Sequence, residues 1–89
     1  MKWQITFSDT ARKQIAKLDR QARARVISFL DQRVASNPNP RSLGEALVGS
    51  KLGEYWRYRV GDYRVICEIQ DERLVILAVA IGHRREIYR

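Results

Sequence analysis

Hydrophobic and polar positions alternate at the start of the chain. In residues 2–7, KWQITF, the three apolar side chains share one face and the three polar ones share the other. Strict alternation of this kind is typical of a half-buried β-strand. Ser8 or Asp9 then suits a helix N-cap, because a short side-chain oxygen can accept a hydrogen bond from a free backbone N–H. The pattern predicts a strand that leads directly into a helix.

The next segment has the spacing of two short helices. Ala11, Ile15 and Leu18 form an apolar stripe, and Asp19 suits the N-cap of a second helix. The stripe of this second helix consists of Ala22, Val26, Phe29, Leu30 and Val34. The sequence NPNP at 37–40 ends it, because proline cannot continue a helix. We expect a helical hairpin, followed over 41–54 by a tethered loop with room for one helical turn.

Three strands separated by tight turns are predicted from residue 55 onward. Residues 55–60 and 63–70 alternate around Gly61-Asp62, a pair that suits a two-residue hairpin turn. Residues 74–81, LVILAVAI, are apolar throughout, as expected for a central strand covered on both faces. The order β-α-α-β-β-β predicts one α+β domain over 1–89, with a small, mostly antiparallel sheet packed on the N-terminal helical hairpin.

Cationic side chains gather on the predicted outer face of this sheet. Arg57 and Arg59 are two residues apart and leave the same face of their strand, and Arg64 follows just across the turn. Like charges this close repel one another, so such a cluster suggests an anion among them. The alternative is an ordinary solvated strand face, in which cations block edge-to-edge aggregation.

The net charge supports an anionic partner. The chain has 17 Lys+Arg against 10 Asp+Glu, a formal charge of +7, and thirteen of the cations are arginines. Arginine binds phosphate oxygens in pairs, which lysine does not. A surplus of this size suggests nucleic acid, an acidic protein or a membrane surface as partner.

Other features narrow the class of protein. The single cysteine, Cys67, falls in an apolar strand and is expected to be a buried, inert thiol in a reducing compartment. One Cys and one His cannot form a zinc site, and no acidic cluster suits magnesium. We find no signal peptide and no membrane span, and therefore expect a cytoplasmic protein that uses no metal, no cofactor and no membrane.

The end of the last strand adds further polar and aromatic residues. His83, Arg84 and Arg85 follow it, and Tyr88 comes soon after. Cations for phosphate with aromatics for base stacking are the composition of a single-stranded nucleic-acid site. A nuclease without metal would favour RNA, whose 2′-hydroxyl is an internal nucleophile. Taken alone, a histidine such as His83 is more often a surface residue than a catalyst, and a tyrosine such as Tyr88 is more often a packing residue.

The run GEALVGSKLGEYWRYRVGDYRVICEIQDERLVILAVAIGHRREIYR at 44–89 resembles the RelE/ParE superfamily of type II toxins, nearest the RelE/StbE branch. The resemblance implies a RelE-like fold and metal-independent cleavage of mRNA in the ribosomal A site. It also implies an acidic RelB-like antitoxin that wraps the toxin, and operator DNA bound by the toxin–antitoxin complex.

The resemblance also implies roles for individual residues. Arg64, His83, Arg84 and Tyr88 fall at catalytic positions, and Arg57, Arg59 and Arg85 at RNA-binding positions. Arg57 and Arg59 stand where the family has lysines, and arginine is a poor general base because its pKa exceeds about 12. His83 is therefore the better general base here. Arg64 and Arg84 are expected to bind phosphate, and Tyr88 is expected to stack on a nucleobase of the RNA.

Two further readings stay open. WRYRVGDYRVI and GHRREIY are specific for the superfamily but do not separate RelE-like ribonucleases from ParE-like inhibitors of DNA gyrase, which have no nuclease activity. A non-toxic module that binds DNA or protein is the third hypothesis. The presence of His83 and Tyr88 beside the arginines favours the ribonuclease.

Overall fold

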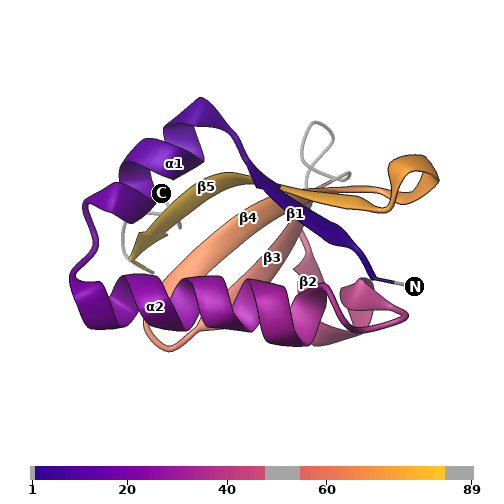
Figure 1. Cartoon of the computed structure of the whole chain (residues 1–89), viewed down its shortest axis with the longest axis horizontal. Coiled ribbons are helices and arrows are strands. Elements are labelled where there is room, and N and C mark those ends of the chain that lie inside the picture. The colour runs from indigo at the N-terminus through magenta and orange to yellow at the C-terminus, as the bar shows by residue number, and fades with distance from the viewer. Residues whose placement is uncertain (1, 48–54, 84–89) are drawn as a thin grey trace.

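A computed structural model describes residues 2–47 and 55–83. These ranges contain five strands and two α-helices, whose arrangement can be followed in Figure 1. The α-helices are α1 (Asp9–Ala16) and α2 (Arg20–Ser28); the strands are β1 (Gln4–Phe7), β2 (Glu45–Ala46), β3 (Tyr55–Val60), β4 (Tyr63–Gln70) and β5 (Val75–His83). Three short helical segments complete the set: a π-helix at Phe29–Val34 and 3₁₀ turns at Pro40–Leu43 and Asp71–Arg73.

The five strands form one sheet in the order β1-β5-β4-β3-β2. Neighbours β5-β4, β4-β3 and β3-β2 are antiparallel, whereas β1 runs parallel to β5. The α+β class and the mostly antiparallel sheet are thus confirmed. The apolar segment predicted as a central strand is β5, which lies between β1 and β4.

Both helices begin where the sequence predicts. The side chains of Ser8 and Asp19 accept hydrogen bonds from the N–H groups of Ala11 and Ala22, which satisfies one exposed donor at each N-terminus. Beyond Ser28 the chain continues α2 as a π-helix, with Ala35 N–H donating to the carbonyl of Leu30 over 2.8 Å. The π-helix was not predicted, because the apolar stripe that indicates a helix in the sequence is the same for an α-helix and for this short π-helix.

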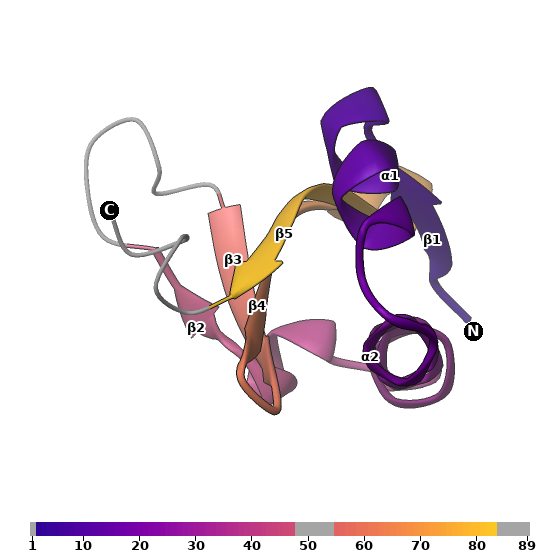
Figure 2. The same ribbon diagram turned by 90° about the vertical axis from the view of Figure 1, so that its left-hand side faces the viewer.

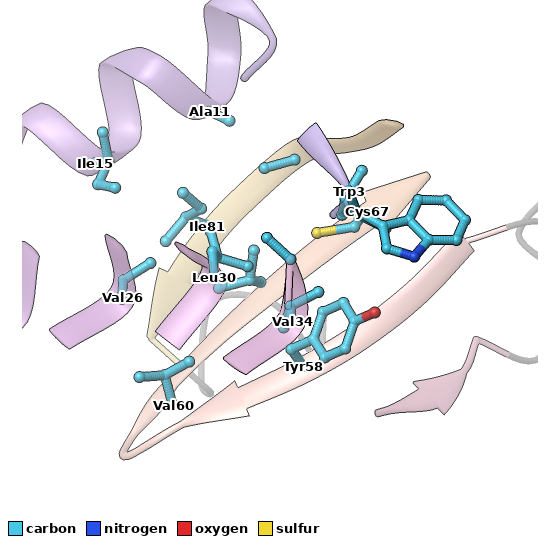
Figure 3. Close-up of a cluster of buried hydrophobic side chains, with 14 of the residues drawn as sticks. Trp3, Ala11, Ile15, Val26, Leu30, Val34, Tyr58, Val60, Cys67 and Ile81 are labelled. Atoms are coloured by element: carbon cyan, nitrogen blue, oxygen red, sulfur yellow. The ribbon is translucent and has the colours of Figure 1, made fainter. Parts of the chain in front are cut away.

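The core lies between the helices and one face of the sheet. Figures 1 and 2 show α1 and α2 on the same side of the strands. Figure 3 shows the side chains that meet there, among them Val26, Leu30 and Val34 from the helical layer and Tyr58 from β3. Cys67 is a free thiol buried in this core, which confirms the predicted burial. Burial also raises its pKa and so disfavours the reactive thiolate.

The segment predicted as a loop over 41–54 is partly regular. Pro40–Leu43 forms a 3₁₀ turn, in agreement with one helical turn, and Glu45–Ala46 adds the edge strand β2 to β3. Arg41 forms a two-point ion pair with Asp71, both contacts 2.8 Å long. Within the described ranges, no helix is long and apolar enough to cross a membrane.

Candidate functional site

Strands β3 and β4 position three arginines on the sheet face opposite the helices. Arg59 pairs directly with Arg64, and Arg57 pairs with Ile66. Tyr58 and Val60 on β3 and Val65 on β4 are buried in the core. The arginines next to them in the strands therefore leave the other face. We call Arg57, Arg59 and Arg64, together with Glu45 on β2, the arginine face.

A carboxylate from the edge strand lies against two of these arginines. Glu45 is paired with Arg57 in the strand register, and its Oε2 accepts a hydrogen bond from Arg57 Nη2. Arg59 Nη2 is 3.8 Å from the same oxygen. The Arg57 side chain is 15% exposed, whereas those of Arg59 and Glu45 are each 57% exposed. Of the two arginines next to Glu45, Arg57 is therefore mostly shielded from solvent and Arg59 is mostly exposed.

The three arginines lower the pKa of the Glu45 carboxyl. The hydrogen bond from Arg57 is the main reason that the pKa of Glu45 lies below its ordinary value, and the charges of Arg59, Arg57 and Arg64 add to the effect. An anion in this position is stabilised by several cations at once. Glu45 was missed in the sequence, since a single acid in a glycine-rich segment gives no periodic pattern.

Arg64 is the one buried residue among the three arginines. The residue is only 7% exposed, and its Nη1 donates to the carbonyl oxygens of Gly61 at 3.2 Å and Tyr63 at 3.1 Å. Gly61 has a φ of +61°, which glycine adopts without strain. The turn that the sequence predicted thus also fixes one guanidinium nitrogen of the arginine face.

The segment before β2 lies so close to the sheet that only glycine fits at one position. A Cβ on Gly44 would lie 2.5 Å from the carbonyl oxygen of Arg57 and 2.8 Å from the Trp56 ring. Two buried or half-buried donors hold this segment: Trp56 Nε1 donates to the Arg41 carbonyl at 3.0 Å, and the Tyr58 hydroxyl to the Pro40 carbonyl at 2.9 Å. These contacts bring Glu45 to the arginines.

His83 lies on the other face of the sheet, which corrects the expectation that it joins the arginines on the outer face. It pairs with Tyr63 in the register, and the two rings meet edge to face with centroids 5.9 Å apart. It lines a pocket together with Gln14, Lys17 and Leu18 from the helical layer.

A β-bulge explains this difference. Ile66 pairs with Ala80 but Cys67 pairs with Ala78, so β5 carries one extra residue between them. An extra residue reverses which face each later side chain takes. His83 would share the arginine face without the bulge. Gly82, opposite Arg64, takes that position instead.

The remaining predicted site residues, Arg84, Arg85 and Tyr88, lie outside the described residues. Within the described ranges the structure therefore brings together Arg57, Arg59 and Arg64, and places His83 at the end of the same sheet on its opposite face. Clustered guanidinium groups can hold an oxyanion and stabilise charge that develops on it. His, Cys, Asp and Glu residues in these ranges form no group of three or more that could hold a metal ion.

Comparison with known proteins finds similar toxins. The chain is 29% identical to Toxin RelG of Mycobacterium tuberculosis over 89 residues, 100% of this chain and 99% of that protein. The toxin–antitoxin complex RelBE2 of the same organism contains a chain that is 26% identical, with a TM-score of 0.84 and coverage of 94% of this chain and 93% of that one.

Two further structures share the fold. The archaeal RelE–RelB complex of Pyrococcus horikoshii has a chain 26% identical, with a TM-score of 0.74 and coverage of 94% and 97%. A free-state Escherichia coli RelE variant is 22% identical, with a TM-score of 0.76 and coverage of 99% and 92%. Residues 5–88 match the family described as the ParE toxin of the type II toxin–antitoxin system, parDE. The chain therefore belongs to the ParE toxin family, within the RelE/ParE superfamily of type II toxins.

Proposed function

We propose that this toxin is a metal-independent endoribonuclease that cleaves mRNA in the ribosomal A site. The observation that carries the proposal is the convergence of Arg57, Arg59 and Arg64 on one sheet face, where they already stabilise an anion, the carboxylate of Glu45. A phosphodiester presents the same kind of oxygen acceptors to the same donors.

The chemistry uses the RNA itself as nucleophile. The 2′-oxygen attacks the adjacent phosphorus, the bond to the 5′-oxygen breaks, and the products are a 2′,3′-cyclic phosphate and a free 5′-hydroxyl. One group removes the 2′-proton and another supplies a proton to the 5′-oxygen. The arginines stabilise the extra negative charge on the phosphate oxygens in the transition state.

His83 is the group of this site best suited to proton transfer, because histidine is the side chain that most often acts as a general acid or base. It lies across the sheet from the arginines, and its neighbour Gly82, the residue opposite Arg64, has no side chain. We place the scissile phosphate at this end of β5, where it can be reached from both faces. Arg84 and Tyr88 are proposed to contact phosphate and base, and Arg85 to contact RNA.

The proposed partners follow from the same assignment. They are the ribosome with its mRNA, an acidic antitoxin and, through the toxin–antitoxin complex, operator DNA. Two of the similar structures are complexes with RelB-type antitoxins, and a formal charge of +7 favours an acidic partner for this chain. We further propose that the toxin acts in the cytoplasm.

A second candidate function is supported by the family match. Residues 5–88 match the ParE toxins, and the resemblance implies that a ParE-like member inhibits DNA gyrase without cutting RNA. The two functions predict different early events in cells. A nuclease cuts translated mRNA at codons early after induction, whereas a gyrase inhibitor first induces the DNA-damage response.

The test is a tightly controlled induction with both readouts. We expect mapped mRNA 5′-ends to appear before any DNA-damage signal, and the variant Arg57→Gln to abolish them. Arg73→Gln is the matched control, because Arg73 is exposed on the turn between β4 and β5. Damage signalling without early mRNA cleavage would overturn the nuclease assignment in favour of gyrase.

A further inference from the structure

Glu45 has a position that the proposed chemistry does not require. Its carboxylate lies within the cationic cluster, in contact with Arg57 and 3.8 Å from Arg59. It comes from a different element, the two-residue edge strand β2. A negative charge in this place competes directly with any anionic ligand of the same arginines.

We propose that Glu45 occupies the anion position of the arginine face in the free toxin and that a bound phosphodiester displaces it. Glu45 is thus a positioning residue: it holds Arg57 by a hydrogen bond and Arg59 by charge until the substrate takes over these contacts. The inference rests on the proposed function only in assigning a phosphate to this face.

The geometry favours an exchange over a permanent ion pair. The Glu45 side chain is 57% exposed, so it can rotate into solvent without leaving a buried charge. Arg57, in contrast, is 15% exposed and comes from a central position of β3, so it stays where it is. The acid is the mobile partner, and the guanidinium is the fixed one.

The position of Glu45 also offsets the repulsion between the positively charged arginines. Arg59 and Arg64 are direct cross-strand neighbours, and like charges in that relation are destabilising. A carboxylate in contact with the cluster offsets this repulsion when no ligand is bound. The cost is a weaker affinity for phosphate, because the ligand must first replace an anion that is already there.

The experiment measures the affinity of inorganic phosphate for the purified full-length chain. Thermal unfolding midpoints are recorded against phosphate concentration at constant ionic strength, since a ligand of the native state raises the midpoint by mass action. Wild type is compared with Glu45→Gln, with Glu45→Asp, and with the control Glu72→Gln, an exposed acid on the turn between β4 and β5.

We expect Glu45→Gln to bind phosphate about two- to fivefold more tightly than wild type, the range that an exposed ion pair supplies. Glu45→Asp, which keeps the charge, should remain nearer to wild type, and Glu72→Gln should match it. The phosphate-free midpoint of each variant shows that it is folded.

Two results would overturn the inference, and they distinguish a failure of the Glu45 displacement from a failure of the phosphate site. If phosphate stabilises wild type and Glu45→Gln equally, the phosphate site stands and the displacement of Glu45 is wrong. If phosphate stabilises neither protein, the assignment of phosphate to the arginine face fails as well, and the proposed function loses its main support.

Discussion

Arg59 and Arg64 lie directly opposite one another on β3 and β4, so two cationic side chains leave the same face of the sheet from neighbouring strands. Arg59 is the open member, with a side chain 57% exposed. We expect Arg59→Gln to weaken binding of single-stranded RNA and to reduce the slope of log K against log salt by about 0.7, the value for one lost phosphate contact.

Fluorescence anisotropy with a short labelled RNA at several salt concentrations measures this slope. Arg73→Gln removes the same charge from an exposed turn. It controls for the effect of the net charge of the protein on RNA binding. Equal slopes for the two variants would mean that Arg59 acts only through net charge.

Arg64 has a structural role beside its proposed catalytic one. Its Nη1 donates to the carbonyls of Gly61 and Tyr63, and the residue is 7% exposed. We expect Arg64→Ala to lower the free energy of unfolding by about 1–3 kcal/mol, because two part-buried hydrogen bonds from a charged donor are lost. Chemical denaturation measures the change. A loss of activity with unchanged stability would show that the turn does not depend on this side chain.

Gly44 is required by the close packing of its segment on β3. Its Cβ in Gly44→Ala would lie 2.5 Å from the Arg57 carbonyl oxygen, so backbone must shift. We expect a loss of about 1–3 kcal/mol in the free energy of unfolding, as for other overpacked sites, together with altered binding of RNA because Glu45 moves away. Ser36→Ala, at an exposed position, is the control for both denaturation and RNA binding.

The ion pair between Arg41 and Asp71 predicts a pH dependence of stability. The hydrogen bond from Arg41 holds the pKa of Asp71 below its ordinary value. A carboxylate with a lowered folded-state pKa stabilises the protein above its unfolded-state pKa of about 3.9, and this contribution is lost as pH falls through the folded-state value. Asp71→Asn should therefore lose less stability than wild type between neutral pH and about pH 3.

Urea denaturation across this range measures the difference. The neighbouring variant Glu72→Gln serves as control, because it removes an exposed acid of the same turn. Parallel stability curves for wild type and Asp71→Asn would contradict the role of the ion pair.

His83 allows proton transfer and ring packing to be separated. His83→Ala removes both the imidazole and its edge contact with Tyr63, whereas His83→Phe keeps a ring. We expect both variants to lose about 10²–10⁴-fold in mRNA cleavage on ribosomes, the range for a general acid or base. Only His83→Ala should lose stability, by about 0.5–1.5 kcal/mol for the aromatic pair. Normal cleavage by either variant would remove His83 from the mechanism.

Local patterns predicted the elements well because each depends on nearby residues. Ser8 and Asp19 cap their helices as expected, and Gly61 makes the turn. The parallel pairing of β1 with β5 was not predicted, because it joins residues about 70 positions apart and no local pattern encodes a partner.

The site was predicted less completely for two physical reasons. The alternation in 55–64 set Arg57, Arg59 and Arg64 on one face, since a hairpin keeps its register. The bulge in β5 could not be read from an entirely apolar run, and it sends His83 to the other side. Glu45 was missed because it reaches the arginines through tertiary packing of Gly44.

The place of β5 between β1 and β4 has a consequence for synthesis of the toxin. Until residues 75–83 leave the ribosome, β1 has no strand partner and one edge of β4 is unpaired. A nascent chain that stops after β4 cannot complete the sheet or its core. Premature termination or proteolysis before β5 should therefore yield harmless fragments, and the cell meets a folded toxin only after β5 has been translated.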